Sequence, residues 1–275
     1  MWTVSHSALS APFDAVAATY DDTFTSSSIG NAQRGAVWRE LTKAFHAGDR
    51  VLEIGCGTGV DACYLAEHGV EVLASDPSPQ MIDVASRRVR HGQLQSLVHT
   101  KILSADEISN LPADDPFDGA FSNFGALNCV ADLKSVAREL ARLLRPGASV
   151  LLCWMGPYCL WEIGRYLGLG NAGKAFRRIH RDGIIAKLGD GASFRVCYPS
   201  ARSLARAFAP EFQVKSVRGI GVAVPPSYME PWARRHPRVL ALCDRLDSWF
   251  GDCPGIRLLG DHVLVRLHRV SCDGG

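Results

Sequence analysis

Short apolar runs alternate with segments of helical period along most of the chain after Arg50. Residues 148–155 are almost continuously apolar, which is typical of a strand buried on both faces. Residues 60–68 and 133–144 show helical spacing, and Pro146-Gly147 is expected to end the second of these helices. The alternation predicts an α/β fold whose parallel sheet is covered on both faces. Other residues expected to bound helices are Gly69, Ser78 and Pro79.

The two ends of the chain are less regular. Residues 1–11 are expected to form a loose tail, and residues 13–41 show helical spacing that breaks at the hydroxyl-rich residues 23–28. Residues 156–192 are expected to be largely helical, and residues 225–260 to contain another helix. The remaining predicted elements are a helix at 203–208 and strands at 212–224 and 262–270.

The composition excludes few functional classes of protein, but it narrows the expected cellular location. The 275 residues suffice for one large domain, and 30 cationic against 28 acidic side chains leave only a weak case for nucleic-acid binding. The nine cysteines form no C-x-x-C pair, so neither a metal site nor a disulfide framework is predicted. The chain shows no secretory signal and no apolar run of about 18 residues, so we expect a cytoplasmic protein without a membrane span.

The most informative segment is the glycine loop, residues 53–59, which follows an apolar run and precedes a helical one. Glycines at alternate positions let backbone N–H groups and a helix N-terminus approach a ligand closely. A dinucleotide-binding loop has a further glycine where this chain has Val60. The carboxylate of Glu53 would repel a pyrophosphate but suits a ligand with an ammonium group. The loop therefore disfavours an NAD-dependent oxidoreductase.

The loop Glu53-Ile54-Gly55-Cys56-Gly57-Thr58-Gly59 resembles motif I of the class I methyltransferases that use S-adenosylmethionine. Further motifs follow in order: Asp76 after a second strand, Ser104-Ala105-Asp106, the strand at 117–123 and the turn at 144–147. The resemblance covers residues 12–155 and implies a Rossmann-like, doubly wound, mostly parallel seven-stranded sheet with a helical cap.

The resemblance also implies a division of the chain. Residues 1–48 correspond to a helical N-terminal lid, and residues 49–155 to the core that binds S-adenosylmethionine. Residues 156–275 complete the same domain, with cap insertions at 156–192 and 225–260. The implied cofactor-binding residues are Glu53, Gly55, Cys56, Gly57, Thr58, Gly59, Asp76, Pro77, Met81, Ala105, Asp106, Asn123 and Phe124.

Within this set, Asp76 is expected to accept from the ribose hydroxyls and Asp106 from the adenine amino group. The candidates for a catalytic role are Tyr20, which matches a lid tyrosine of ubiquinone-type methyltransferases, and Asn123 at the end of the fourth strand. Arg34 either reaches the methionine carboxylate or is an ordinary exposed helix residue, and the second interpretation is preferred.

The acceptor is less well defined than the methyl donor. The fourth strand lacks the Asn-Pro-Pro-Tyr sequence typical of enzymes that methylate nucleobase or glutamine amino groups. Apolar residues at 160–167 favour a small aromatic or lipid-like molecule, whose acceptor atom stays open. The basic residues 174–181 are interpreted as a solvated face, with docking to an acidic substrate or weak peripheral membrane association as the alternative. His180, His236 and Tyr228 are conceivable bases, although a structural role is preferred for each.

A methyltransferase that acts on a small molecule is therefore the leading hypothesis. A non-catalytic protein that binds S-adenosylmethionine is the alternative, followed by the NAD-dependent oxidoreductase. The oligomeric state stays open.

Overall fold

A computed structural model describes residues 12–180, 182–188 and 192–271 of the chain, so the predicted tail at 1–11 lies outside the described residues. Its centre is a seven-stranded sheet in the order β3-β2-β1-β4-β5-β9-β8. The predicted α/β, doubly wound fold is confirmed. The strands are β1 (Arg50–Ile54), β2 (Glu71–Asp76), β3 (Val98–Ile102), β4 (Phe117–Ser122), β5 (Leu144–Trp154), β8 (Phe212–Ile220) and β9 (His262–Arg269).

The first five strands are parallel, whereas β9 lies between β5 and β8 and runs antiparallel to both. The first residue of β9, His262, therefore lies at the same edge of the sheet as the carboxyl ends of the parallel strands. In a doubly wound sheet this edge is where ligands bind.

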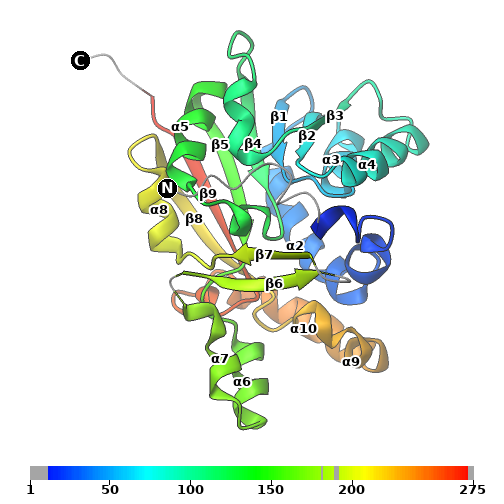
Figure 1. Cartoon of the computed structure of the whole chain (residues 1–275), viewed down its shortest axis with the longest axis vertical. Helices are drawn as coiled ribbons and strands as arrows, with labels where there is room; N and C mark the ends of the chain where they lie inside the picture. Colours follow the sequence, from blue (N-terminus) through cyan, green and yellow to red (C-terminus); the bar gives the residue numbers. More distant parts are fainter. Residues whose placement is uncertain (1–11, 181, 189–191, 272–275) are drawn as a thin grey trace.

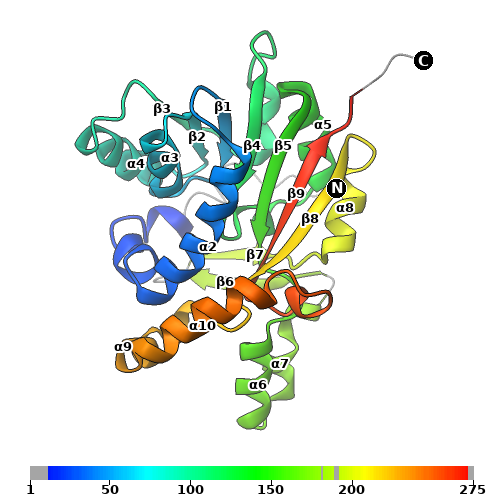
Figure 2. The same cartoon turned by 180° about the vertical axis from the view of Figure 1, so that it is seen from behind.

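Alternate residues of each central strand enter two different hydrophobic cores. Leu52 faces one core together with the helices α5 (Leu133–Leu143) and α8 (Ala201–Phe208). Val51 faces the other core with α2 (Ser28–Ala44) and α3 (Val60–Glu67). Figure 2 shows α2 lying across this second face of the sheet. The layers explain why the strand sequences are apolar on both sides.

Local signals set several helix boundaries as expected. Ser78 accepts a hydrogen bond from the Met81 backbone N–H and caps α4 (Pro79–His91), and α3 ends before Gly69, which has a positive φ. Helix α5 ends earlier than predicted, because the chain enters β5 at Leu144 before it reaches Pro146-Gly147. Pairing of β5 with β4 starts there and shifts register before Ser149.

The prediction that residues 156–192 are largely helical was wrong. Two short helices, α6 (Leu160–Gly168) and α7 (Ala172–Ala175), are followed by a β-hairpin of β6 (Ile184–Leu188) and β7 (Ala192–Val196). In β7 the aromatic Phe194 and the β-branched Val196 alternate with the polar Ser193 and Arg195, and this period of two was missed. Gly183 permits the tight approach of the strands, because a Cβ there would lie 2.4 Å from the Val196 carbonyl oxygen. The hairpin crosses below the carboxyl ends of the main strands (Figure 1).

The insertion at 225–260 contains two helices rather than one: α9 (Glu230–Arg235) and α10 (Pro237–Phe250). Pro237 starts the second helix and cannot continue the first. The carboxylate of Glu230 accepts hydrogen bonds from the backbone N–H groups of Ser28 (2.9 Å) and Ile29 (3.0 Å). This distant acid thus caps the N-terminus of α2 and ties the insertion to the N-terminal segment.

The N-terminal segment divides into two parts. Residues before α2 include a π-helical turn, Asp21–Thr25, and Ser27 then caps α2, which agrees with the break predicted at residues 23–28. Helix α2 itself buries Val37 and Leu41 in the core of the sheet. Among the described residues no helix is long and apolar enough to cross a bilayer.

Candidate cofactor and acceptor site

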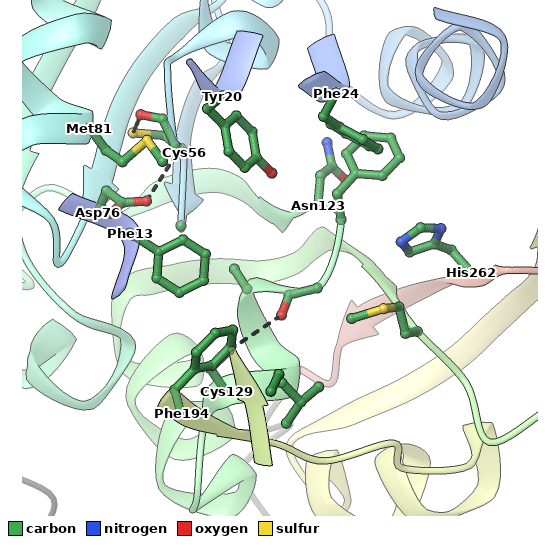
Figure 3. A pocket seen from close by; sticks show the side chains of 18 of the residues that line it. Phe13, Tyr20, Phe24, Cys56, Asp76, Met81, Asn123, Cys129, Phe194 and His262 are labelled. Atoms are coloured by element: carbon green, nitrogen blue, oxygen red, sulfur yellow. Dashed lines mark hydrogen bonds between the residues drawn. The ribbon is translucent and has the colours of Figure 1, made fainter. Parts of the chain in front are cut away.

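A cavity of about 460 Å³ lies at the carboxyl edge of the parallel strands. One end is formed by the glycine loop, and the other is closed by the β6–β7 hairpin and the start of β9. Phe13, Tyr20 and Phe24 from the N-terminal segment line it, and Figure 3 shows Phe13 and Tyr20 directed into the space. The cavity therefore joins parts of the chain that are far apart in sequence.

The glycine loop has the backbone conformation that its sequence predicts. Gly55 has a φ of +75°, and a Cβ there would lie 2.2 Å from the Ala126 Cβ. Gly57 has a φ of +52°, and a Cβ there would meet nothing within 4 Å. Gly55 is thus needed for packing as well as for its dihedral angle, whereas Gly57 leaves open space beside the cavity.

Asp76 is held in place at the end of β2. Its Oδ2 accepts a hydrogen bond from the Gly57 N–H and its Oδ1 accepts one from the Ser78 N–H, both at 2.9 Å. Burial raises the pKa of Asp76 to about 6, although these two N–H donors oppose the shift. The second strand and the glycine loop are therefore linked by one carboxylate that also lines the cavity.

A second buried carboxylate, Asp61 on α3, collects three donors. It accepts from Arg34 Nη1 (2.5 Å), Trp38 Nε1 (2.7 Å) and Asn123 Nδ2 (2.9 Å). The interpretation of Arg34 as an exposed helix residue was wrong, because this side chain is 6% exposed and its guanidinium stacks over Phe124 at 4.8 Å. No hydrophobic period in residues 28–44 places an arginine on the buried face of α2.

Three polar atoms around Asp61 have no hydrogen-bond partner within the described residues: Glu53 Oε2, Asn123 Oδ1 and Arg34 Nε. Glu53 is 1% exposed, and burial, reinforced by the charge of Asp61, raises its pKa well above the usual value. Two acceptors and one donor are thus enclosed beside the glycine loop. This donor set fits a ligand end that carries both an ammonium and a carboxylate group.

A further wall of the cavity near the glycine loop combines apolar and acidic groups. Pro77, Met81 and Ala105 line it together with Asp106, which lies in a short 3₁₀-helix (Ala105–Asn110). Burial, with Asp132 and Glu107 nearby, raises the pKa of the Asp106 carboxyl. A flat apolar slot with one acceptor at its rim suits a heteroaromatic ring with an amino group.

The N-terminal segment is fastened to the glycine loop by Asp21. Thr58 Oγ1 donates a hydrogen bond to Asp21 Oδ1 at 2.7 Å, and Arg88 forms an ion pair with Asp21 Oδ2. Arg88 also donates through Nε to the Thr58 carbonyl at 2.9 Å. These contacts hold the turn that carries Tyr20 and Phe24 over the cavity.

Most of the predicted site residues meet at the cavity. Glu53 and Gly59 do not line it: Glu53 is enclosed behind the loop, and Gly59 opens α3 against Ala85. Both catalytic candidates, Tyr20 and Asn123, lie in the lining, where Figure 3 shows them on neighbouring walls. The other predicted residues in the lining are Gly55, Cys56, Gly57, Thr58, Asp76, Pro77, Met81, Ala105, Asp106 and Phe124.

Several lining residues were missed by the sequence analysis. His262 is 5% exposed, its Nδ1 lies 3.5 Å from Asp261 Oδ2, and its ring packs edge-on against Phe124 at 5.4 Å. Burial lowers the pKa of His262, while the charge of Asp261 opposes the shift. Phe194 of β7 contacts Phe13 with ring centroids 5.2 Å apart. The period-two pattern of the hairpin could have located Phe194, whereas no local signal marks His262.

The basic cluster at 174–181 is not a solvated face throughout. Arg178 is 6% exposed and pairs with Glu162 and with Asp261, each at 2.8–2.9 Å. Arg177 pairs with Glu162 as well. Two carboxylates therefore neutralise these arginines and brace the cap. Of the bases considered from sequence, Tyr228 lines the cavity and burial raises its pKa to about 12, whereas His180 and His236 are not in the lining.

Comparison with known proteins identifies the core of the chain. Residues 52–150 match the family model of a methyltransferase domain. The demethylmenaquinone methyltransferase of Clavibacter sepedonicus is 37% identical over 149 residues, which are 53% of this chain and 57% of that protein. The same enzyme of Mycobacterium marinum is 34% identical over 146 residues, 51% of this chain and 56% of that protein. The chain thus spans little more than half the length of these curated relatives.

Solved structures extend the similarity of fold over nearly the whole chain. The CcbJ methyltransferase of Streptomyces caelestis has a TM-score of 0.62 at 14% identity and covers 98% of this chain and all of that one. The [4+2]-cyclase SpnF has a TM-score of 0.56 at 18% identity, over 88% and 81% of the two chains. Residues 52–150 of the chain are therefore similar to a methyltransferase domain, and the fold of the chain is that of S-adenosylmethionine-dependent methyltransferases. These matches support the predicted family and cofactor.

Proposed function

We propose that the protein transfers a methyl group from S-adenosylmethionine to a small, largely apolar acceptor. The observation that carries this proposal is one continuous cavity, which runs from the glycine loop to the β6–β7 hairpin. Such a cavity can hold a donor and an acceptor end to end, and alignment of two reactants is the main requirement of a methyl transfer. The fold alone would not decide, because SpnF shares it and is a cyclase.

The cofactor end of the cavity is matched to S-adenosylmethionine in shape and charge. Asp76 would accept from the ribose hydroxyls, and the slot of Pro77, Met81, Ala105 and Asp106 would take the adenine. Asn123 and Arg34, which line the cavity, and Glu53, which is enclosed directly behind the loop, have polar atoms without partners that would take the ammonium and carboxylate of the methionine part. The carboxylates Glu53, Asp61 and Asp76 outnumber the one buried cation among these groups, which favours a ligand with sulfonium and ammonium charges over a pyrophosphate.

The cofactor supplies an activated methyl group on its sulfonium when bound. The chain has to hold the acceptor in line with that methyl group and keep water away. Tyr20 and Phe24 lie over the centre of the cavity, where aromatic faces and a phenol oxygen stabilise a positive charge. We infer that residues 12–27 act as the lid and that α2 serves as its fixed base, since α2 is buried in the core.

The acceptor end is lined mainly by aromatic and aliphatic side chains. Phe13, Phe124, Phe194, Val130 and Met155 form its walls, and polar groups are grouped around His262. Such a lining favours a flat apolar molecule with one polar end. The relatives named as demethylmenaquinone methyltransferases share only the core of this chain, so their substrate supports an aromatic acceptor and nothing more specific.

The experiment is a transfer assay with S-adenosylmethionine labelled in its methyl group. The panel would contain hydroxylated naphthalenes, simple phenols, aliphatic amines and thiols, and Asp76→Ala would serve as the matched control. We expect label to appear in at least one aromatic hydroxy compound with the native protein and to fall sharply in the variant. Tight binding of S-adenosylhomocysteine without transfer to any compound would contradict the proposal and favour a non-catalytic binding protein.

A further inference from the structure

We propose that His262 is the general base of this site and that the acceptor is an aromatic molecule with an ionisable hydroxyl group. The proposal rests on the methyl transfer proposed above and narrows its acceptor. The position of the imidazole, the groups that hold it, and the unsuitability of the other ionisable groups in the cavity support this assignment.

The position of His262 follows from the antiparallel insertion of β9. Its strand starts at the carboxyl edge of the sheet, next to the end of β5. The ring packs edge-on against Phe124 at an interplanar angle of 82°, and Phe124 follows Asn123 at the end of β4. Figure 3 shows the imidazole on the wall of the cavity beyond Asn123, across from Phe13 and Tyr20. An acceptor held against the aromatic walls would therefore lie between the glycine loop and this ring.

The groups behind the ring fix its orientation. Nδ1 is buried, has no hydrogen-bond partner among the described residues and lies 3.5 Å from Asp261 Oδ2, so the charge of that carboxylate favours the tautomer with its proton on Nδ1. Asp261 is held in turn by Arg178 Nη2 at 2.9 Å and by Gln33 Nε2 at 3.4 Å. Nε2 is then the nitrogen left to accept a proton. The arrangement of Arg178, Asp261 and His262 is that of a general base whose orientation is set by a fixed carboxylate.

The charges around the ring keep it neutral near pH 7. Burial is the largest influence and lowers the pKa of His262, Asp261 raises it, and Arg178 lowers it. Arg34 on α2 lies across Phe124, where Asp61 compensates its charge. A neutral imidazole can accept a proton at this pH, whereas an imidazolium could not.

Other ionisable groups of the cavity are poorer bases. Burial raises the pKa values of the Tyr20 and Tyr228 hydroxyls and of the Cys129 thiol, so all three stay protonated. Asp76 is engaged by two backbone N–H groups. Compared with these four groups, His262 is the better base, because its neutral form is available and its fixed partner lies behind it.

The proposed step moves one proton to His262 and one methyl group to the acceptor oxygen. The hydroxyl proton of the acceptor passes to Nε2 of His262 while the acceptor oxygen forms its bond to the methyl carbon. The bond between that carbon and sulfur breaks, and its electron pair stays on sulfur. The products are the methyl ether, the neutral thioether and an imidazolium, which returns its proton to solvent as the product leaves. Proton removal of this kind contributes about 10²–10⁴-fold to a rate.

The test uses protein labelled with ¹⁵N in its histidines, saturated with S-adenosylhomocysteine, and 1-naphthol as the probe. His262→Gln assigns the resonance of His262, and His99→Gln, an exposed residue of β3, is the matched control. We expect 1-naphthol to shift the Nε2 resonance of His262 and leave that of His99 unchanged. Its affinity should fall about tenfold in His262→Ala, as expected for the loss of one hydrogen bond.

Titration of the same sample provides the second readout. The pKa of His262 should lie below 6.5 and fall further in Asp261→Asn, because the carboxylate charge raises it. A pKa above 7 would overturn the proposal, as would 1-naphthol that fails to bind or binds without moving the His262 resonance. Failure of S-adenosylhomocysteine to bind would instead refute the proposed function, and this inference with it.

Discussion

The two ends of the cavity are built in different ways. The cofactor end comes from short contiguous motifs at the carboxyl ends of β1, β2 and β4, where strand, loop and helix follow one another directly. The acceptor end combines the N-terminal segment, the β6–β7 hairpin and the first residue of β9, which come from three separate regions of the chain at residues 12–27, 184–196 and 262. Local sequence can specify the first end, whereas tertiary folding alone assembles the second. Variants can test whether the two ends contribute independently to stability and to ligand binding.

The largest effect is expected at Gly55. Gly55→Ala adds a Cβ only 2.2 Å from the Ala126 Cβ at a φ of +75°, and we expect a loss of about 2–5 kcal/mol of unfolding free energy. Gly57→Ala is the matched control, since its Cβ would have open space and only the strain of about 1–2 kcal/mol remains. Urea denaturation of both variants measures the difference. Equal losses would show that the packing of the loop against Ala126 is unimportant.

The next effect concerns Asp76. Asp76→Ala should weaken binding of S-adenosylhomocysteine by about 1–3 kcal/mol, because the acceptor for the ribose hydroxyls is lost. The folded pKa of about 6 exceeds the usual 3.8, so the ionised carboxylate forms only as the pH rises through about 6. Affinity in the native protein should therefore rise over this range and stay flat in the variant. Calorimetry that finds no pH dependence in either protein would place the ribose elsewhere.

The same shift predicts the sign of a stability change in the ligand-free protein. Between pH 3.8 and about 6 the folded state holds the Asp76 proton more tightly than the unfolded state. This group therefore stabilises the fold less as the pH rises through that window. Asp76→Ala should remove this part of the pH dependence, which thermal unfolding at several pH values can measure.

A smaller effect is expected where the lid meets the cofactor end. Asp21→Asn removes the ion pair with Arg88 but keeps an oxygen that can accept from Thr58 Oγ1. We expect S-adenosylhomocysteine to dissociate about two- to fivefold faster, since a partly exposed ion pair contributes at most about 1 kcal/mol. Asp22→Asn, an exposed neighbour, is the control. A dissociation rate unchanged by Asp21→Asn in stopped-flow experiments would argue against this residue as the lid fastening.

The smallest effect concerns the cap. Glu230→Gln should cost about 1 kcal/mol of stability, because the carboxylate caps α2 through the Ser28 and Ile29 N–H groups. Burial opposes ionisation of Glu230, but these donors lower its pKa below the usual 4.5. Its contribution is therefore present above that value and is lost as the pH falls through the folded pKa. The two proteins should converge in denaturation experiments once the pH has fallen below the folded pKa of Glu230.

The same contrast explains what the sequence could predict. The glycine loop and the caps of α3 and α4 depend on neighbours within a few residues, and Asp76 depends on Gly57, 19 residues before it. Their places in the fold were predicted. The burial of Arg34 depends on Asp61 and Phe124, and the environment of His262 depends on Arg178, so both needed the folded chain. The ligand roles assigned to the cofactor-binding residues stay predictions.

The hairpin was missed for a different reason. Its two strands are short and follow two short helices, so the helical period of residues 160–168 was extended too far. Pairing of β6 with β7, rather than the propensity of either strand, stabilises the structure. Elements of this kind form the acceptor end, which is why the donor was easier to predict than the acceptor.

The central claim is that the glycine loop and the enclosed acids beside it bind S-adenosylmethionine rather than a dinucleotide. Calorimetric titration of the unmodified protein with S-adenosylhomocysteine, and separately with NADH, tests it most directly. We predict saturable one-to-one binding of S-adenosylhomocysteine and none of NADH, because Val60 stands where a dinucleotide-binding loop has a further glycine and the buried carboxylates beside the loop outnumber the one buried cation. Saturable binding of NADH without binding of S-adenosylhomocysteine would contradict the account.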